Sequence, residues 1–317
     1  MERIRKALER AGQDRQLSAT DVLRQTSQGV QADLSTGVRY TMTKMVEVSP
    51  QELLTNRIIA ALPEHKCKDA YRMLRTRVLQ TMRNNGWTSV AVTGPASGCG
   101  KTLTAINLAV SLAMEVSNTV LLVDLDLRRP TVHKYFGYEP ELGLSDYLTK
   151  DVPLHQLLFT PGIDRLVVLP GRSALPNSAE MLRSPRMIAL VNELKTRYPD
   201  RLIVFDLPPI LAADDALAFS PYTDCFLMVA ESGGTRKEDL QKAYEILKST
   251  PLVGTVLNKS EVPSTGYGYA AAPKAKKRYF KSRAKTEDSS AAGLKSGLKI
   301  GQKSGLMSRL KKRFSRK

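Results

Sequence analysis

The feature that most constrains this chain is a glycine-rich turn between a strand pattern and a helix pattern. The apolar run 89–93 leads into Gly94-Pro95-Ala96-Ser97-Gly98-Cys99-Gly100-Lys101-Thr102, and residues 103–114 have helical periodicity. In this setting, the glycines let backbone N–H groups point at phosphate oxygens, and the helix N-terminus adds partial positive charge. The segment therefore predicts a phosphate-binding loop. Its nucleotide-binding residues are expected to be Ala96, Ser97, Gly98, Cys99, Gly100, Lys101 and Thr102.

Two side chains of this loop have expected roles. Lys101 is expected to bridge the β and γ phosphates of ATP, and the Thr102 hydroxyl is expected to bind Mg²⁺. Pro95 stands where the strict pattern has glycine. The alternative, a glycine turn that binds nothing, is disfavoured by the Lys-Thr pair and its strand–turn–helix context.

Short β-branched runs alternate with helical patterns from Thr88 onward. The predicted strands are 89–93, 120–124, 166–169, 202–206, 225–230 and 252–257. Several are apolar without alternation, as in parallel strands that helices cover on both faces. The alternation predicts one α/β domain with a doubly wound, mostly parallel sheet.

Acidic residues stand at the ends of two of these strands. Asp124 ends the run 120–124, and Asp206 ends the run 202–206. Strand alternation predicts Asp126 and Arg128 on the same side as Asp124. Buried carboxylates are costly unless they meet a cation. Asp206 is therefore expected to hold magnesium through water, the Walker B role. A helix cap or turn former is the alternative for any one of these residues.

The ends of the chain differ from its middle. Residues 1–20 are predicted to form an amphipathic helix, 21–50 a linker, and 51–82 helical structure interrupted near Pro63. Residues 274–317 carry sixteen Lys or Arg and two acidic residues, which is +14 of the chain's +17 formal charge. The expected division is 1–50 (helix and linker), 51–262 (P-loop domain) and 263–317 (flexible basic tail).

The tail predicts contact with a polyanion. Leu306, Leu310 and Phe314 recur at helical spacing among basic residues, the pattern of an interfacial helix on an anionic membrane. A solubilising tail, or one that binds any polyanion, is the alternative. No apolar stretch has the length of a transmembrane helix, and the charged start lacks the apolar core of a signal peptide, so we expect neither. The three cysteines are scattered. These features predict a cytoplasmic protein, peripheral at the inner face of the plasma membrane.

The set Gly98–Thr102, Asp124-x-Asp126-x-Arg128 and Asp206-x-Pro208-Pro209 resembles the bacterial tyrosine kinases of capsule and exopolysaccharide systems. The resemblance covers about residues 57–262 and implies a P-loop NTPase fold of the ParA/MinD-like class, with ATP and Mg²⁺ as cofactors. It implies Thr102, Asp124 and Asp206 as the magnesium shell, and Lys101, Asp126 and Arg128 as catalytic residues. Asp126 is the candidate base for the tyrosine proton, although the sequence leaves open which of Asp124 and Asp126 does which job.

The resemblance extends to assembly and regulation. Asp69, Arg72 and Arg75 resemble the family's oligomerisation helix, with Asp69 in place of Glu, and a ring-like homo-oligomer is implied. Spacings of three place them on one helix face; a merely solvated face is the alternative. Tyr267, Tyr269 and Tyr279 are the expected autophosphorylation sites, modified in trans, unless their presence in the tail is accidental. A separate transmembrane activator of the chain-length-determinant type and a cognate tyrosine phosphatase are the implied partners.

Two other functions remain open. A ParA/MinD-type positioning ATPase shares this fold, but its signature lysine position is Ala96 here. A nucleotide-gated scaffold without kinase activity is the third reading. The sequence does not identify the polysaccharide or other protein substrates.

Overall fold

The computed structural model describes residues 43–260, apart from residues 66, 116, 151 and 198–199. The strands are β1 (Lys44–Met45), β2 (Ser89–Thr93), β3 (Thr119–Asp124), β4 (Phe159–Thr160), β5 (Leu166–Leu169), β6 (Arg201–Asp206), β7 (Cys225–Glu231) and β8 (Leu252–Asn258). The α-helices are α2 (Pro50–Thr55), α3 (Lys68–Asn85), α4 (Lys101–Ala113), α5 (Val132–Tyr135), α6 (Leu144–Thr149), α7 (Ser178–Leu182), α8 (Pro185–Thr196), α9 (Asp215–Phe219) and α10 (Lys237–Leu247). Short 3₁₀ turns are η1 (Ile59–Ala61), η2 (Leu154–Gln156) and η3 (Ser220–Tyr222).

The strands form one sheet in the order β1-β4-β5-β3-β6-β2-β7-β8. All neighbouring pairs are parallel except β4 with β5, which are antiparallel. The sheet is thus mostly parallel and doubly wound, as predicted. Because β6 lies between β2 and β3 and pairs with both in parallel, the carboxyl ends of these three strands are adjacent at the same end of the sheet.

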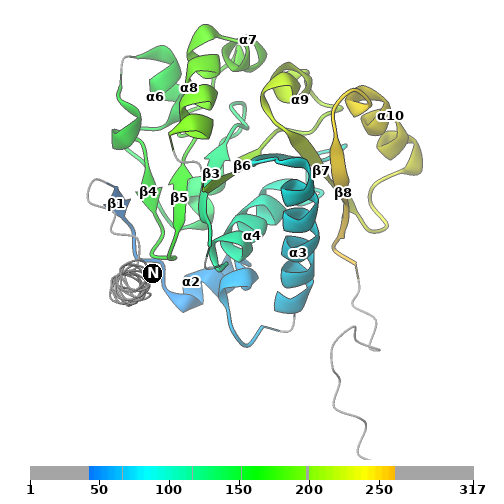
Figure 1. The fold of residues 1–317 in the computed structure, drawn as a ribbon, viewed down its shortest axis with the longest axis horizontal. Coiled ribbons are helices and arrows are strands. Elements are labelled where there is room, and N and C mark those ends of the chain that lie inside the picture. Colours follow the sequence, from blue (N-terminus) through cyan, green and yellow to red (C-terminus); the bar gives the residue numbers. More distant parts are fainter. Residues whose placement is uncertain (1–42, 66, 116, 151, 198–199, 261–317) are drawn as a thin grey trace, which may run out of the picture. The chain divides into compact units, whose positions relative to one another are not determined.

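Helices cover both faces of the sheet (Figure 1). Alternate strand residues such as Val90 and Val92 pack against α3 and α4, whereas Ala91 belongs to a second core with α6, α8 and α10. Almost every residue of α4 is buried. These two apolar layers explain why the strands are continuous apolar runs rather than alternating ones.

The N-terminal part of the described chain differs from the sequence-based interpretation. Residues 21–50 were expected to be a linker, but Lys44–Met45 pair with Phe159–Thr160 at the sheet edge. Ser49 also begins α2, since its hydroxyl accepts the Glu52 N–H and the Glu52 carboxylate accepts the Ser49 N–H. The sequence did not predict β1, because two strand residues with exposed side chains form no apolar run. The predicted helix 1–20 lies outside the described residues.

The segment between α2 and η1 is tied to α4 by one buried side chain. The Asn107 Oδ1 atom accepts the Ala60 N–H at 2.9 Å, and its Nδ2 atom donates to the carbonyls of Arg57 and Leu103, both at 3.0 Å. Arg57 has a positive φ of 59°. Asn107 therefore satisfies backbone groups of a strained turn and links that turn to the helix that follows the glycine-rich loop.

Replacing Asn107 with alanine should destabilise the fold. The Ala60 N–H would be left buried without a partner, so we expect the free energy of unfolding to fall by about 2–4 kcal/mol. Thr196→Ala is the control, because the Thr196 hydroxyl bonds only the exposed Asn192 carbonyl one turn away. Urea denaturation followed by circular dichroism measures both. Equal stability of Asn107→Ala and the control would contradict this role.

Candidate active site

The glycine-rich loop joins β2 to α4. Gly98 and Gly100 have φ values of 82° and 90°, a conformation that side-chain-bearing residues rarely adopt. A Cβ atom on Gly100 would also lie 2.0 Å from the Asn258 Nδ2 atom. Pro95 fits its position because that residue needs no left-handed φ. The loop conformation thus depends on glycine at positions 98 and 100, not at position 95.

Neighbouring segments hold the loop in place. The Asn258 amide, at the end of β8, donates to the Cys99 carbonyl at 3.0 Å. The N–H groups of Ile210 and Leu211, which follow β6, donate to the carbonyls of Gly94 and Pro95. Cys99 itself is buried, and burial raises the pKa of its thiol. The thiol therefore packs inside the loop. Sequence reasoning missed Asn258, since nothing in the sequence marks its contact with a loop so distant along the chain.

Two buried carboxylates lie side by side beneath this loop. Asp124 and Asp206 are register partners in β3 and β6, and Asp206 is also paired with Val92 of β2. The Asp124 carboxylate accepts the N–H groups of Asp126, Thr131 and Val132 at 2.9–3.2 Å. By contrast, neither oxygen of Asp206 has a hydrogen-bond partner among the described residues.

The third acidic residue, Asp126, contacts the loop directly. Its Oδ2 atom lies 3.0 Å from the Lys101 Nζ atom, and its Oδ1 atom accepts the Arg129 N–H. Lys101 also lies 3.4 Å from the Thr102 hydroxyl. The side chain of Asp126 is 10% exposed, whereas Asp124 and Asp206 are fully buried. Asp126 is therefore the least buried carboxylate of this group.

The carboxylates perturb one another's ionisation. Burial and the nearby Asp206 charge raise the pKa of Asp124 well above its usual range. Burial also raises the pKa of Asp206, to about 6, although Lys101 and Thr102 oppose the shift. Burial would lower the pKa of Lys101, but the carboxylates of Asp206, Asp126 and Asp124 raise it. This is a site with excess negative charge and an unsatisfied carboxylate, and it fits a bound cation.

The protein side chains supply only part of a coordination shell, so the cation that fits is one that also binds waters and phosphate oxygens. Within the described ranges, no group of three or more His, Cys, Asp or Glu side chains is arranged to hold a metal. Mg²⁺ is usually held by one or two carboxylates together with waters and substrate phosphates. Asp206, Asp124 and the Thr102 hydroxyl beside a phosphate-binding loop match that donor set.

Comparison with known proteins agrees with this chemistry. Residues 90–272 match the family described as CobQ/CobB/MinD/ParA nucleotide binding domain. The chain is 36% identical over 217 residues to tyrosine-protein kinase YwqD of Bacillus subtilis (strain 168), covering 68% of this chain and 90% of YwqD. The chain belongs to the bacterial tyrosine kinases. It is thus a nucleotide-binding P-loop protein of a protein-tyrosine kinase family.

Other relatives set the extent of the match. The chain is 30% identical to the putative tyrosine-protein kinase EpsB of Ralstonia nicotianae (strain ATCC BAA-1114 / GMI1000), covering 70% of this chain but 29% of EpsB. The crystal structure of the chimerical protein CapA2B2 superimposes with a TM-score of 0.61 at 26% identity, covering 69% of this chain and 94% of that one. The bacterial tyrosine-kinase domain thus accounts for most of the described residues.

Arg128 of this kinase points to a partner that the sequence did not suggest. Its Nε atom lies 2.9 Å from the Oδ2 atom of Asp215, which begins α9 and is fully buried. Strand alternation predicted Asp124, Asp126 and Arg128 on one side, but β3 ends at Asp124. The two later residues lie in a turn, where strand periodicity does not apply, and they face Lys101 and Asp215 instead.

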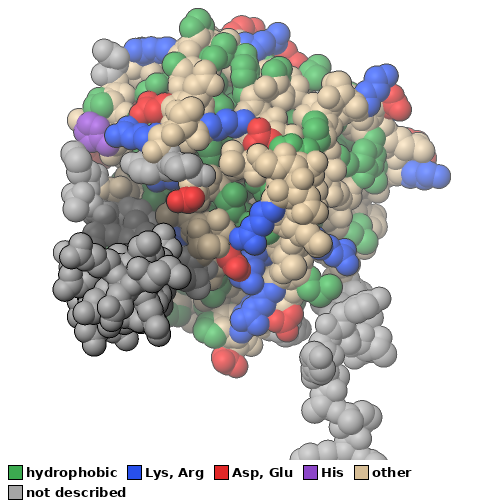
Figure 2. Space-filling model, viewed as in Figure 1, with side chains coloured by type: hydrophobic (Ala, Val, Ile, Leu, Met, Phe, Trp, Pro, Cys, Tyr) green, Lys and Arg blue, Asp and Glu red, His purple; other side chains and the backbone are tan. Residues whose placement is uncertain are grey.

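The kinase's predicted oligomerisation face is only partly open. On α3, the side chains of Asp69 and Arg72 are 64% and 52% exposed and form an ion pair at 3.4 Å. Arg75 instead donates to the Ser111 carbonyl at 3.1 Å and pairs with Glu115. Figure 2 shows Lys and Arg side chains in a column beside α3, with acidic side chains among them. Arg72 is therefore available to a partner, whereas Arg75 packs α3 against α4.

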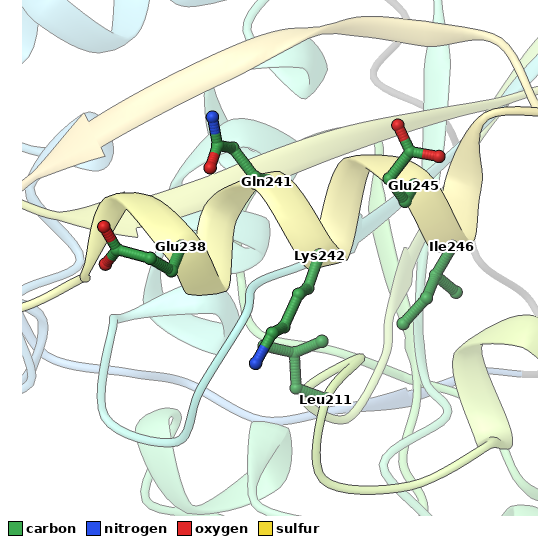
Figure 3. A pocket seen from close by; sticks show the side chains of 6 residues that line it. All are labelled: Leu211, Glu238, Gln241, Lys242, Glu245 and Ile246. Carbon is green, nitrogen blue, oxygen red and sulfur yellow. The ribbon is translucent and has the colours of Figure 1, made fainter.

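A groove of about 520 Å³ lies beside α10. It is lined by Leu211, Glu238, Gln241, Lys242, Glu245 and Ile246 (Figure 3). Lys242 and Ile246 project from α10 on the side of Leu211 (Figure 3). None of the predicted site residues lines the groove, and we assign no chemistry to it.

The remaining sequence-based site residues, Tyr267, Tyr269 and Tyr279, lie outside the described residues. None of the described helices is both long and apolar enough to cross a membrane.

Replacing Asp206 with asparagine should stabilise the ligand-free kinase, and more so at neutral than at acidic pH. The folded state keeps the Asp206 proton up to about pH 6, whereas the unfolded state loses it near the ordinary value of 3.8. Between these values the folded state binds more protons, so the free energy of unfolding falls as pH rises. The gain from Asp206→Asn should therefore be about 1–2 kcal/mol larger at pH 7.5 than at pH 4.5.

Urea denaturation at both pH values measures this difference. The control is Asp214→Asn, whose exposed carboxylate pairs with Arg183 at the surface and should give no pH-dependent gain. If Asp206→Asn destabilised the protein equally at both pH values, ionisation of the buried, unpaired Asp206 carboxylate would not be what lowers the free energy of unfolding at neutral pH.

Proposed function

We propose that this protein is an ATP-dependent protein-tyrosine autokinase that regulates exopolysaccharide or capsule synthesis or export and phosphorylates its own tail in trans. The observation that carries the proposal is the Lys101–Asp126 contact at 3.0 Å beside the buried Asp124–Asp206 pair, in a chain of the tyrosine-kinase family. The loop lysine and a partly exposed carboxylate then meet where a transferred phosphoryl group would lie. The polysaccharide role rests on the family resemblance.

Each residue near the loop has its own role in the proposed transfer of phosphate from ATP to tyrosine. The tyrosine hydroxyl oxygen attacks the γ-phosphorus of ATP, the bond to the β–γ bridging oxygen breaks, and ADP leaves. Asp126 takes the hydroxyl proton, because it is the least buried of the three carboxylates. Lys101 and the N-terminus of α4 stabilise the charge on the phosphate oxygens.

Thr102, Asp206 and Asp124 would hold Mg²⁺. The ion, when bound with ATP, supplies charge neutralisation on the β and γ phosphates. Asp124, with three backbone donors on its carboxylate, orients the site, whereas Asp206 offers two oxygens without partners. The sequence left open which of Asp124 and Asp126 does which job; on the burial and hydrogen bonds of the two carboxylates, we propose Asp126 as the base and Asp124 as part of the metal shell.

The alternatives predict other products. A ParA/MinD-type ATPase would hydrolyse ATP without forming phosphotyrosine, and a nucleotide-gated scaffold would do neither. Ala96 at the signature lysine position argues against the first, and the partly exposed Asp126 argues against the second.

Substituting Lys101 by methionine should abolish autophosphorylation. Loss of a preorganised charge typically lowers the rate by about 10²–10³-fold. Mass spectrometry of the tail peptides after incubation with Mg·ATP measures the product, and Tyr267, Tyr269 and Tyr279 are the expected sites. Lys242→Met on the exposed face of α10 is the control and should keep full activity.

Mixing a mass-tagged Lys101→Met chain with the wild-type chain tests whether phosphorylation occurs in trans. Asn258 contacts the chain's own loop, and Tyr267 follows it by nine residues. Nine extended residues reach about 30 Å, so the length of the tail permits phosphorylation within one chain as well as between chains. Phosphotyrosine on the tagged Lys101→Met tail is the expected result. Phosphate confined to wild-type chains would reject trans phosphorylation, and wild-type activity of Lys101→Met alone would reject the site.

Trans phosphorylation requires assembly, and we propose a ring-like homo-oligomer that uses Arg72 of α3. Arg72→Ala should reduce the molar mass in light scattering. Arg75 is a poor test, because its substitution would also remove the contact with Ser111. Arg77→Ala, on an exposed position of the same helix, is the control. Unchanged mass for Arg72→Ala would reject this interface.

The location and partners complete the proposal. The basic tail would place the protein at the inner face of the plasma membrane, in the cytoplasm. A separate transmembrane chain-length-determinant-type protein would activate it, and a tyrosine phosphatase would reverse the reaction. The tail residues lie outside the described ranges, so the membrane contact rests on their sequence pattern.

A further inference from the structure

Asp215 pairs with only the Nε atom of the Arg128 guanidinium group. The Arg128 Nε atom lies 2.9 Å from the Asp215 Oδ2 atom. Within the described part of the chain, neither terminal nitrogen of Arg128 makes a hydrogen bond that the structure records, and the side chain is 47% exposed. The planar fork is thus fixed in orientation while its two terminal NH₂ groups face outward, free to bind an anion.

Fold stability does not explain this pair. Asp215 is fully buried, and its Oδ1 atom has no hydrogen-bond partner among the described residues. Replacing a buried ion pair with apolar residues of similar volume is often neutral or stabilising, so such a pair is weak evidence for a role in stability. A buried charge in this arrangement indicates a role in orienting its partner.

The pair also lies where two parts of the active site meet. Arg128 belongs to the turn from Asp126 to Arg129, closed by the Arg129 N–H bond to the Asp126 carbonyl at 3.0 Å. Asp126 contacts Lys101 of the loop. Asp215 stands at the end of the segment that begins at Asp206 and bonds the loop through Ile210 and Leu211. The ion pair therefore joins the segment after β3 to the segment after β6.

We propose that Asp215 is a positioning residue that orients Arg128, so that the two free NH₂ groups of Arg128 bind the phosphoryl group during its transfer. The inference rests on the proposed phosphotransfer function. Arg128 touches the transferred group, and Asp215 acts only through Arg128.

A double-mutant cycle on the full-length protein tests this assignment. Asp215→Asn keeps the shape of the side chain and removes its charge, and Arg128→Ala removes the guanidinium. We expect Asp215→Asn to lower kcat for phosphotyrosine formation about tenfold, with Mg·ADP affinity and KM for ATP within about twofold of wild type. In the Arg128→Ala background, Asp215→Asn should change kcat by less than about twofold. The control is Asp214→Asn, an exposed neighbour that should behave as wild type.

A second readout does not depend on tyrosine as the acceptor. Aluminium fluoride, a mimic of the transferring phosphoryl group, should tighten Mg·ADP binding to the wild-type protein. Asp215→Asn and Arg128→Ala should each weaken that tightening by about tenfold, and the double variant no further. If phosphotyrosine were absent from the wild type but this coupling remained, the kinase proposal would fail and the positioning role would stand. Equal effects of Asp215→Asn in the wild-type and Arg128→Ala backgrounds, in either readout, would overturn the positioning role.

Discussion

The pairing of β3 with β6 places two buried carboxylates next to each other, and the active site depends on that contact. Asp124 and Asp206 face one another in register, and burial raises the pKa of both. The sheet can hold such a pair because its core is large and because backbone donors satisfy Asp124. Asp206, by contrast, has no hydrogen-bond partner among the described residues. A buried carboxylate without a partner is costly, and this cost is what the proposed magnesium ion would offset.

The other parts of the site depend on the same end of the sheet. β2 pairs with β6, so the glycine-rich loop begins beside Asp206, and Lys101 reaches Asp126. Segments after β6 and β8 then hold the loop through backbone bonds and through Asn258. The pair of Arg128 and Asp215 joins the segment after β3 to the segment after β6. The proposed site residues thus lie at strand ends or in segments that follow them, and this fixed placement suits the positioning that phosphoryl transfer requires.

The sequence predicted the sheet better than it predicted the contacts of the site. Buried parallel strands are continuous apolar runs, so the run 166–169 coincides with β5. β1 was missed because Lys44 and Met45 are exposed at the edge. Regular spacing placed Arg75 with Arg72, but the long side chain of Arg75 turns to the Ser111 carbonyl. Asp215 was not singled out in the sequence, because only tertiary structure brings it to Arg128.

The central claim is that the carboxyl ends of β3 and β6, with the glycine-rich loop, hold a divalent cation together with the nucleotide. The most direct measurement is a crystal structure of the full chain with ADP and Mn²⁺, with the ion located by its anomalous scattering. The expected result is one anomalous peak between the Thr102 hydroxyl, the Asp206 carboxylate and the phosphates of ADP. A peak at other residues, or ADP bound at the loop with Asp206 still unpaired and no metal beside it, would contradict the claim.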